Sequence, residues 1–347
     1  MRNFDYSLLR ARTFDREVIN YIGLIHEFKG RQQLYLEQKP RELETLVEIA
    51  KIQSTESSNA IEGIATTKAR LKSLMADKTT PRDRGEKEIK GYRHVLNVIH
   101  ENFDYVPIRK NYILQLHKML YQFTEERSGG SFKDTPNEID MVYPDGRTVL
   151  LFKPLEPFET PEAVEKLCEE YDKAINKYGI DPLIAIPVFI HDFLCIHPFN
   201  DGNGRMSRLL TTLLLYKSGF VIGRYISLEK KIEITKDEYY VALQESSQNW
   251  HEEKNDDTAF IKYILGTIVA AYRDFEERVN MLGKKVSARD MVEKAIRSKI
   301  GKFTKNDIME LCPEIGRGSV ENSLKALCEE GIIKKEGQGR ATFYYTI

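Results

Sequence analysis

Residues 197–208, with the sequence HPFNDGNGRMSR, combine a titratable base, a carboxylate, a glycine-flanked turn and two arginines in a segment that continues into an apolar helix. Backbone N–H groups at a helix N-terminus attract anions, and Gly202 and Gly204 allow that backbone to approach a ligand closely. Arg205 and Arg208 have helical i, i+3 spacing, so we expect both guanidinium groups to point toward the same ligand. The combination indicates binding of a polyphosphate.

The segment resembles the HxFx(D/E)GNGRxxR signature of Fic-domain proteins, which typically transfer AMP from ATP to a protein hydroxyl. A histidine with an ordinary pKa of about 6.5 can accept the proton of an attacking Ser, Thr or Tyr side chain. The resemblance implies that His197 is this general base, that Asp201 holds Mg²⁺ on the α- and β-phosphates, and that Phe199 packs inward. The ATP contacts that it implies are Glu62, His197, Gly202, Asn203, Gly204, Arg205, Met206, Ser207, Arg208, Tyr239, Tyr240 and Asn249.

Residues 58–63, with the sequence SNAIEG, resemble the (S/T)xxxE(G/N) inhibitory motif of one class of this family. Ser58 and Glu62 have i, i+4 spacing and so share one face of a helix that we expect to stop at Gly63. The resemblance implies that Glu62 pairs with Arg208 and occupies the place of the ATP γ-phosphate. The simpler alternative is a surface glutamate at the end of a helix.

Two weaker features extend the resemblance. Pro144-Asp145-Gly146 is a turn signal between two runs of β-branched and aromatic residues, which predicts a hairpin near residues 137–153. The family has a flap there that adds a strand to an extended target segment, although the hairpin could simply cover the helices. Tyr239, Tyr240 and Asn249, expected on the helix after the long motif, resemble residues that contact adenine and ribose, but packing explains them equally well.

Other chemistries have less support. Residues 197–199 could merely cap a core helix, with the arginines on a solvated face. His191, Cys195 and His197 do not have the spacing of three zinc ligands on one helical face, and neither an HExxH, a Walker nor a kinase signature is present. A runner-up function is a DNA-binding regulator that uses the Fic core as a nucleotide sensor, and the same site could also remove AMP.

The composition limits the possible partners and location. The 347 residues are long enough for two or three domains, and 52 Lys and Arg nearly balance 53 Asp and Glu, so no overall charge draws the chain to nucleic acid or membrane. Four scattered cysteines without CxxC spacing argue against a disulfide framework. Neither a signal peptide nor a lipidation signal is apparent, and the apolar run 182–194 is shorter than the roughly 20 residues that span a bilayer. We therefore expect a cytoplasmic protein in which this run is a buried helix.

Hydrophobic periodicity predicts a mainly α fold, and the resemblance implies a Fic-type helical bundle with a β-hairpin flap. An N-terminal helical region, residues 1–105, would carry the inhibitory helix near 54–63, and the catalytic core would be residues 106–282. The expected helices cover much of 14–74, 86–103, 111–121, 161–177, 182–195, 204–216 and 236–282.

Residues 283–347 are expected to form a separate winged helix-turn-helix module. Helices at 288–300, 304–311 and 319–330, the second capped by Thr304, precede two short strands at 332–334 and 342–346. The module has 13 Lys and Arg against 9 Asp and Glu, a net charge of +4. This modest charge favours protein recognition or homodimer contacts over tight DNA binding. The expected partners are thus ATP, a target protein with a side-chain hydroxyl, and a second copy of the chain.

Overall fold

The computed structural model describes residues 2–38, 40–125, 129–142, 148–283, 287–297, 299, 301–339 and 342–346. This part of the chain is mainly helical, as expected. It divides into two compact units, of which unit 1 is Met1–Gln33 with Ala50–Tyr272 and unit 2 is Leu34–Ile49 with Arg273–Ile347. Helices that contribute residues to both units are α1 (Arg16–Gln38), α2 (Pro40–Ile61) and α11 (Thr258–Gly283).

Unit 1 holds the long motif and most of the helices. Its remaining helices and short 3₁₀ turns are η1 (Tyr6–Arg10), α3 (Lys68–Met75), α4 (Arg84–Asn102), η2 (Phe103–Tyr105), α5 (Lys110–Tyr121), α6 (Thr160–Asn176), α7 (Pro182–Ile196), α8 (Asn203–Lys217), η3 (Val221–Arg224), α9 (Leu228–Ile234) and α10 (Lys236–Ser247). Because α4 packs against both α5 and α8, the expected division at residue 105 does not coincide with a boundary between the compact units.

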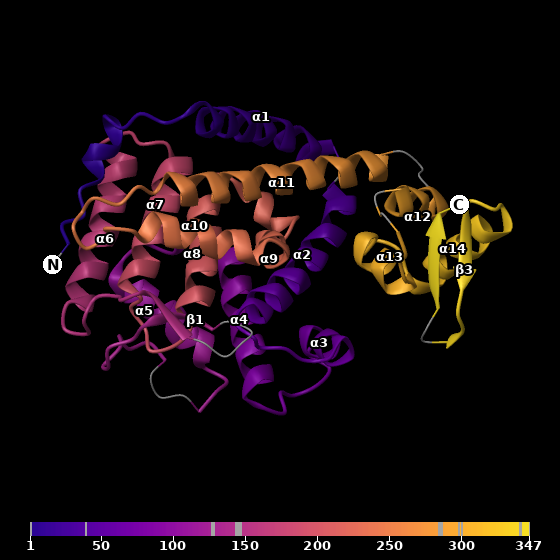
Figure 1. Cartoon of the computed structure of the whole chain (residues 1–347), viewed down its shortest axis with the longest axis horizontal. Helices are drawn as coiled ribbons and strands as arrows, with labels where there is room; N and C mark the ends of the chain where they lie inside the picture. Colours follow the sequence, from indigo (N-terminus) through magenta and orange to yellow (C-terminus); the bar gives the residue numbers. More distant parts are fainter. Residues whose placement is uncertain are drawn as a thin grey trace. The chain divides into compact units, whose positions relative to one another are not determined.

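Helix α7 lies at the centre of unit 1. It begins where the Asp181 side chain accepts the N–H of Leu183 and where Pro182, at the first helical position, needs no N–H partner. Residues 183–196 are all buried, which explains the apolar run in the sequence. Helix α7 packs against α6 and α8 (Figure 1). Among the described residues, no helix is both long and apolar enough to cross a membrane.

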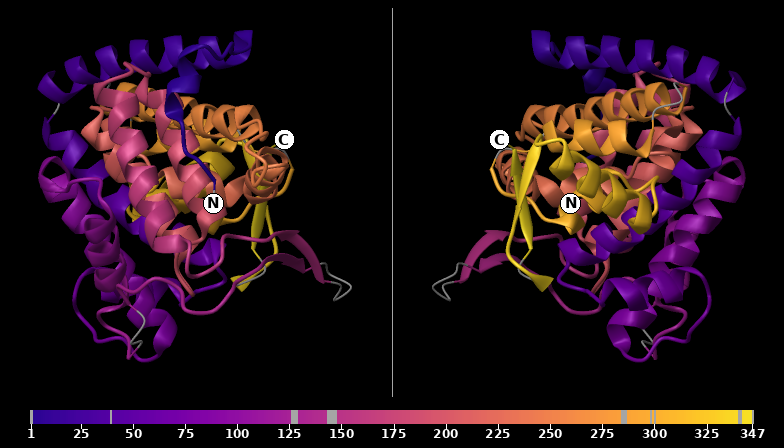
Figure 2. Two further views of the ribbon diagram at one scale, coloured as in Figure 1. Left: turned by 90° about the vertical axis from the view of Figure 1, so that its left-hand side faces the viewer. Right: turned by 90° about the vertical axis from the view of Figure 1, so that its right-hand side faces the viewer.

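Two antiparallel strands, β1 (Ile139–Val142) and β2 (Thr148–Phe152), interrupt the helices. Figure 2 shows them, in magenta, reaching outward beyond the helices of unit 1. The turn expected at Pro144-Asp145-Gly146 lies outside the described residues. The base of β2 is fixed by the ring of Phe152, which stacks on His251 with centroids 5.3 Å apart.

One expectation about the helices is wrong. The run 236–282 is not one helix, because residues 248–257 separate α10 from α11. Trp250 in this break is fully buried, and its indole N–H donates to Asp192 at 2.7 Å, so tertiary packing overrides the helical periodicity. The helical run 14–74 consists of α1, α2 and α3, with the expected helix end just before Gly63, and the short helix α9 was not predicted.

Unit 2 includes a small helical module with its own core. Its elements are α12 (Ala288–Arg297), α13 (Lys305–Leu311), α14 (Arg317–Glu329) and the antiparallel strands β3 (Ile333–Glu336) and β4 (Phe343–Thr346). Thr304 and Asp307 form a capping box at the start of α13, and side chains such as Ile296, Ile308 and Leu324 are buried together. The order of elements is the expected one, and the assignment as a winged helix stays a prediction.

Candidate active site

The long motif forms the connection between α7 and α8. Helix α7 ends at Ile196, and His197 follows in the left-handed region at φ 50°. The loop turns again at Gly202, with φ 83°, where a Cβ atom would approach the Tyr121 hydroxyl to 2.9 Å. The first helical hydrogen bond of α8 runs from the N–H of Met206 to the carbonyl of Gly202 at 2.8 Å. The amides of residues 203–205 therefore precede the helical ladder and are available to an anion.

His197 lies in this loop with one ring nitrogen engaged. Its Nδ1 is 3.2 Å from the carbonyl of Leu194, which can only accept, so Nδ1 carries the proton and Nε2 keeps its lone pair. Burial, together with the charge of Lys133, lowers the pKa of His197 to about 4. The imidazole is therefore neutral at neutral pH and can accept a proton through Nε2.

Asp201 is the most exposed charged group of the loop, with 54% of its side chain accessible. Its Oδ1 accepts the N–H of Gly202 at 2.6 Å, and Oδ2 lies 3.3 Å from Arg84 at the start of α4. An exposed carboxylate beside the free amides of α8 is a suitable donor for a hard cation that also contacts phosphate.

The two arginines of the motif do not point toward the same place. The Arg205 guanidinium is buried, pairs with Glu88 of α4 and donates to the Tyr121 hydroxyl at 2.7 Å. Arg205 and Arg208 are both buried and have different partners, so i, i+3 spacing does not by itself direct two side chains to one ligand. Arg205 Nη2 also lies 3.5 Å from Asp201 Oδ1, so Arg205 contacts the exposed carboxylate of the loop, and its contact with a ligand stays a prediction.

Arg208 instead meets the end of α2. Its Nε donates to Ser58 Oγ at 2.8 Å, and its Nη2 donates to the Ser58 carbonyl at 2.8 Å and to Glu62 Oε1 at 2.7 Å. Burial would lower the pKa of Arg208, but the Glu62 carboxylate beside it raises that pKa above the usual value. The spacing of Ser58 and Glu62 thus brings both onto one arginine.

Glu62 lies directly over the first turn of α8. A Cβ atom added to Gly204 would come within 2.2 Å of Glu62 Oε1. Helix α2 ends at Ile61, whose carbonyl accepts Lys236 Nζ at 2.7 Å, and Gly63 follows with φ 77°. A carboxylate therefore sits against the helix N-terminus, where an anion is stabilised.

Comparisons with known proteins place this geometry in a family. The model of the Fic/DOC family matches residues 107–215. A Fido domain-containing protein of Dictyostelium discoideum is 31% identical over 122 residues, which are 34% of this chain and 80% of that protein. The chain belongs to the Fic/DOC family.

Other relatives of the Fic/DOC chain are more distant. Protein adenylyltransferase fic-1 of Caenorhabditis elegans is 28% identical over 108 residues, which are 31% of this chain and 19% of that protein. The crystal structure of a Fic family protein from Desulfovibrio desulfuricans G20 superimposes with a TM-score of 0.62 at 22% identity and covers 97% of both chains. A structure of Fic-1 from C. elegans has a TM-score of 0.56 at 19% identity and covers 77% of this chain and 73% of that one. Both structural likenesses concern the fold alone.

The other motif residues of this Fic/DOC chain shape the loop. Phe199 is fully buried, and the Asn203 side chain both accepts the N–H of Phe199 at 2.9 Å and donates to its carbonyl at 2.7 Å. Met206 is buried, and the Ser207 hydroxyl donates to the Gly204 carbonyl at 2.7 Å. These side chains stabilise the loop and the helix, and among these residues only Asn203 has a backbone amide that precedes the helical hydrogen bonds of α8.

His117 of α5 contacts the loop through Phe199 and Asp201. The sequence did not predict this role. Its ring stacks on Phe199 with centroids 3.7 Å apart and planes 4° from parallel. Its Nδ1 accepts the N–H of Gly130 at 3.0 Å, so its Nε2 donates to the carbonyl of Asp201 at 3.1 Å. A histidine on the apolar face of an amphipathic helix fits the sequence pattern of a buried packing residue. Its contact with the loop is therefore visible only in the tertiary structure.

Of the three residues expected to contact adenine and ribose, two lie near the Glu62–Arg208 pair. The Tyr239 side chain is buried, and the charges of Arg208 and Glu62 act on both Tyr239 and Tyr240, so the two tyrosines lie near that pair. Asn249 is not on their helix, because α10 ends at Ser247 and Asn249 is an exposed turn residue with φ 56°. The break at 248–257 is again the reason for the error.

His191 and Cys195 belong to a different cluster. The Cys195 thiol lies 3.4 Å from His191 Nε2, and His191 Nδ1 lies 2.7 Å from Asp257. Among the described residues no group of three or more metal-ligating side chains is assembled.

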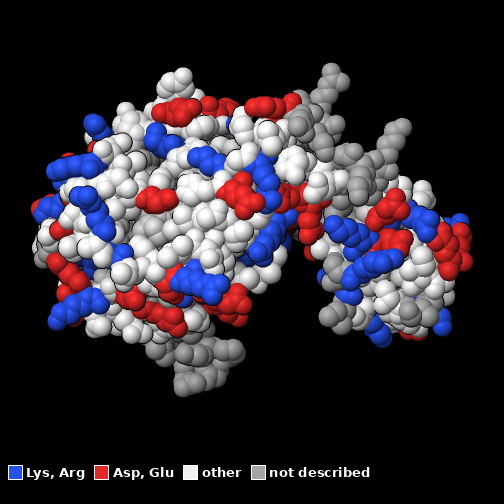
Figure 3. All heavy atoms as spheres, turned by 90° about the horizontal axis from the view of Figure 1, so that it is seen from above, with Lys and Arg blue, Asp and Glu red and all other residues white. Residues whose placement is uncertain are grey.

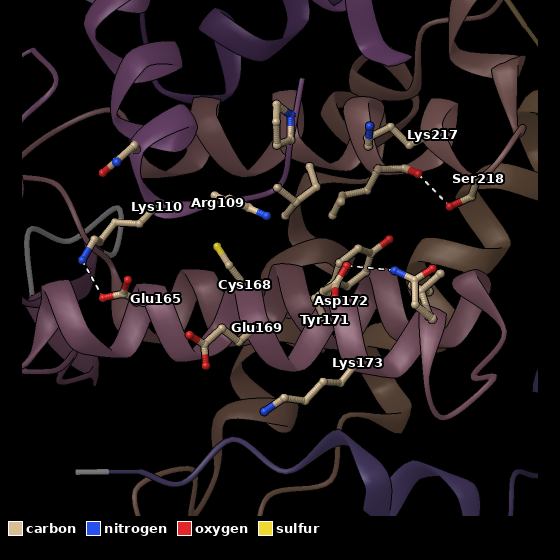
Figure 4. A pocket seen from close by; sticks show the side chains of 16 residues that line it. Arg109, Lys110, Glu165, Cys168, Glu169, Tyr171, Asp172, Lys173, Lys217 and Ser218 are labelled. Carbon is tan, nitrogen blue, oxygen red and sulfur yellow. Dashed lines mark hydrogen bonds and ion pairs between the residues drawn. The ribbon is translucent and has the colours of Figure 1, made fainter. Parts of the chain in front are cut away.

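A cavity of about 760 Å³ opens at the other end of α8, between α5 and α6 (Figure 4). Its basic side chains face acidic ones, and Lys110 pairs with Glu165 at 2.6 Å. Lys217 and Ser218 at the end of α8 also line it. The length of α8 thus separates this cavity from the motif. Its lining contains neither a histidine nor the start of α8, so it lacks the general base and the anion site described above.

Proposed function

We propose that this chain is a protein adenylyltransferase that transfers AMP from ATP to a Ser, Thr or Tyr hydroxyl of a protein, itself included, and releases pyrophosphate. The family membership supports this proposal, as does the name of its relative fic-1, a protein adenylyltransferase. The observation that carries it is local. A neutral histidine with a free Nε2 stands beside a helix N-terminus whose anion position is filled by the carboxylate of Glu62.

In the proposed reaction, His197 Nε2 accepts the proton of the target hydroxyl while that oxygen attacks the α-phosphorus of ATP. The bond between the α-phosphorus and the bridging oxygen breaks, and pyrophosphate leaves. The amides at the start of α8 bind phosphate oxygens, and Arg208 binds the outer phosphates once Glu62 has left it. Catalysis then consists of positioning and electrostatic stabilisation.

The proposed cofactor is Mg²⁺, held by Asp201. The exposed carboxylate oxygen beside free amide groups fits a hard cation shared with phosphate. When bound, the ion neutralises charge on the departing pyrophosphate. Arg84, now 3.3 Å from Asp201 Oδ2, would have to share that oxygen with the ion.

We further propose that Glu62 is an inhibitory residue. Its carboxylate occupies an anion site and pairs with Arg208, so ATP cannot place its outer phosphate there in a productive pose. Ser58 holds the same arginine through its hydroxyl and carbonyl, and Gly63 ends the helix. A charge-assisted hydrogen bond contributes about 1.5–3 kcal/mol, which corresponds to about one to two orders of magnitude in rate.

The remaining parts of the chain receive roles by proposal. We assign β1 and β2 to the docking of an extended target segment by strand addition. The module of α12–α14, β3 and β4 is proposed to be a winged helix used for protein recognition or dimer contacts. On the face seen in Figure 3 its Lys and Arg alternate with Asp and Glu, and Lys305 and Arg317 both pair with Glu321, which supports protein over DNA as a partner. We propose a cytoplasmic location.

The test is incubation with ATP labelled at the α-phosphate and Mg²⁺, in native lysate and with the purified chain alone. Glu62→Gly should label protein about tenfold to a hundredfold faster than the unmodified chain. His197→Ala in the Glu62→Gly background should abolish labelling. Labelling that survives His197→Ala contradicts the mechanism, and Glu62→Gly that labels no faster than the unmodified chain contradicts the inhibitory role.

A further inference from the structure

Lys133 is a buried lysine in the segment that leads into β1. Only 3% of the residue is exposed. Its Nζ donates to the carbonyl of Ile196 at 3.0 Å and to Asn137 Oδ1 at 2.9 Å. A buried ammonium group is costly unless oxygen atoms surround it. The carbonyl of Ile196 and the side chain of Asn137 therefore offset the cost of burying the ammonium group. In return, the ammonium group satisfies the last carbonyl of α7.

The contacts of Lys133 lie on both sides of His197. Ile196 comes directly before the histidine, and Pro198, whose carbonyl accepts the backbone N–H of Lys133 at 2.9 Å, comes directly after it. The last carbonyls of a helix lack helical partners and form the negative end of its dipole, so a cation is stabilised there. One residue thus fixes the backbone before and after the proposed base.

The same segment holds the rest of the loop. Asn137 Nδ2 donates to the carbonyls of His197 at 3.3 Å and Phe199 at 3.0 Å, and Asn200 Nδ2 donates to Asp134 at 3.0 Å. These bonds do not involve the His197 ring, whose Nδ1 is bound to Leu194. The bonds from Asn137 and Asn200 fix the position of the loop backbone and so the position of the imidazole. The carbonyl of Leu194 determines that Nε2, and not Nδ1, is the basic nitrogen.

We propose that Lys133 is a positioning residue for His197, in which the charged ammonium group on the last carbonyl of α7 holds the loop and the segment before β1 together. The proposal rests on the function proposed above, because it concerns the same base. Without the ammonium group the left-handed backbone of His197 loses its anchor, and Nε2 moves relative to the target hydroxyl. A displacement of about 1 Å can cost about a hundredfold in rate.

The charge of Lys133 gives this role a pH dependence. Burial lowers the pKa of Lys133 to about 8, although the nearby carboxylates of Glu156 and Glu159 oppose the shift. His197 faces the same ammonium group but is neutral in this range, because burial lowers its own pKa to about 4. Lys133 is therefore charged below pH 8 and loses its charge as the pH rises through that value. An arginine at this position stays charged throughout.

The experiment uses the full chain in the Glu62→Gly background, with Lys133→Met and Lys133→Arg as variants. The control is Lys166→Met, which removes a lysine paired with Glu162 on the surface of α6. The kcat for AMP transfer and the KM for ATP are measured from about pH 6 to about pH 9.5. Lys133→Met should lower kcat about tenfold to a hundredfold with KM within about twofold. Lys133→Arg should retain activity and lose the decline that the Glu62→Gly reference shows above about pH 8.

Hydrogen exchange of the amides of residues 196–203 provides a readout independent of transfer. It should be about tenfold faster in Lys133→Met, and unchanged in Lys133→Arg and Lys166→Met. If the Glu62→Gly reference does not transfer AMP, the proposed function is wrong. The positioning role of Lys133 is then tested by the hydrogen-exchange rates alone. A Lys133→Met protein with unchanged kcat and exchange overturns the proposal. If Lys133→Met does not fold, an alkaline decline in Lys133→Arg equal to that of the reference overturns it.

Discussion

At the scale of single residues, the hydrogen bonds and burial of His197 determine its protonation state. The carbonyl of Leu194 fixes the proton on Nδ1 of His197, and burial keeps the ring neutral, so Nε2 is a base without prior deprotonation. A histidine of ordinary pKa would be mostly protonated below pH 6. The environment of His197 extends its use as a base to more acidic conditions.

The pH profile of transfer tests this point. A base with a pKa of about 4 remains neutral as the pH falls from about 7.5 to about 5.5, whereas one with a pKa of about 6.5 loses about tenfold of its basic form. In Glu62→Gly, kcat at saturating ATP should change less than about twofold over this range. Removing the Glu62 charge, which raises the pKa of His197, can only strengthen the effect. A tenfold fall in kcat would show that the pKa is ordinary.

Gly204 provides a second test at this scale, because its missing Cβ leaves the space that Glu62 now fills. Gly204→Ala places a methyl group over the first turn of α8, so it should displace the carboxylate and also obstruct phosphate. In the Glu62→Gly background we expect Gly204→Ala to weaken ATP binding by at least about tenfold, measured by calorimetry. The surface substitution Gly316→Ala, where nothing lies within 4 Å of the new Cβ, is the control. Equal affinities for the two variants would place the nucleotide elsewhere.

The sequence predicted the loop and the Glu62–Arg208 pair because both reside in short motifs with fixed spacing. It did not predict that Arg205 would turn to Glu88, since that partner is 117 positions away and only the packing of α4 on α8 brings them together. His117 and Lys133 were missed for the same reason. Each acts through backbone groups of the loop, and such contacts leave no pattern in the chain.

At the scale of elements, the segment that carries Glu62, the proposed inhibitory residue, is held by three helices besides α2. Arg208 of α8 binds Ser58, Lys236 of α10 caps Ile61, and Glu233 of α9 accepts the Ser57 hydroxyl at 2.7 Å. The end of α2 is therefore fixed by side-chain contacts from α8, α9 and α10. Of these contacts, only those of Arg208 involve the arginine that also pairs with Glu62.

Ser58→Ala tests the role of this arginine. It removes the hydroxyl that accepts Arg208 Nε but leaves the carboxylate, so transfer should rise about threefold to tenfold, less than in Glu62→Gly. Ser57→Ala is the matched control, because it removes an equally buried hydroxyl from the same helix without touching Arg208. Its rate should stay within about twofold of the unmodified chain. Equal activation by both would mean that loosening of α2, and not the arginine, controls transfer.

Elements were predictable where one face of a periodic segment is buried, as in α5, or where a long apolar run is buried on all sides, as in α7. Prediction failed at residues 248–257, where the chain leaves the helix so that Trp250 can be buried beside Asp192. The resulting turn moves Asn249 off α10. Local periodicity continues through such a break, so the sequence does not reveal it.

At the scale of the whole molecule, unit 1 contains three buried neutral histidines. Burial lowers the pKa of His100 to about 3 and those of His117 and His197 to about 4. Unfolding exposes them, and at pH 5 these three histidines together bind about three more protons in the unfolded chain than in the folded one. Burial would also lower the pKa of His191, but Cys195 and Asp257 raise it above its usual value, so His191 is protonated in both states at this pH.

The free energy of unfolding of unit 1 should therefore fall as the pH decreases from about 6.5 to about 4, with a slope near pH 5 of about 4 kcal/mol per pH unit. Urea denaturation at closely spaced pH values measures this slope. His100→Gln keeps a polar side chain near Tyr216 but removes one titrating group, so its slope should be smaller by about 1.3 kcal/mol per pH unit. A stability independent of pH in this range would mean that the rings are already protonated when folded.

The backbone of His197 has a consequence for how such a chain can change. A left-handed residue other than glycine costs about 1 kcal/mol of folding free energy. A glycine would relieve that cost and abolish the base at the same step. Selection for stability alone would therefore favour glycine at this position, whereas selection for the proposed reaction would retain the imidazole.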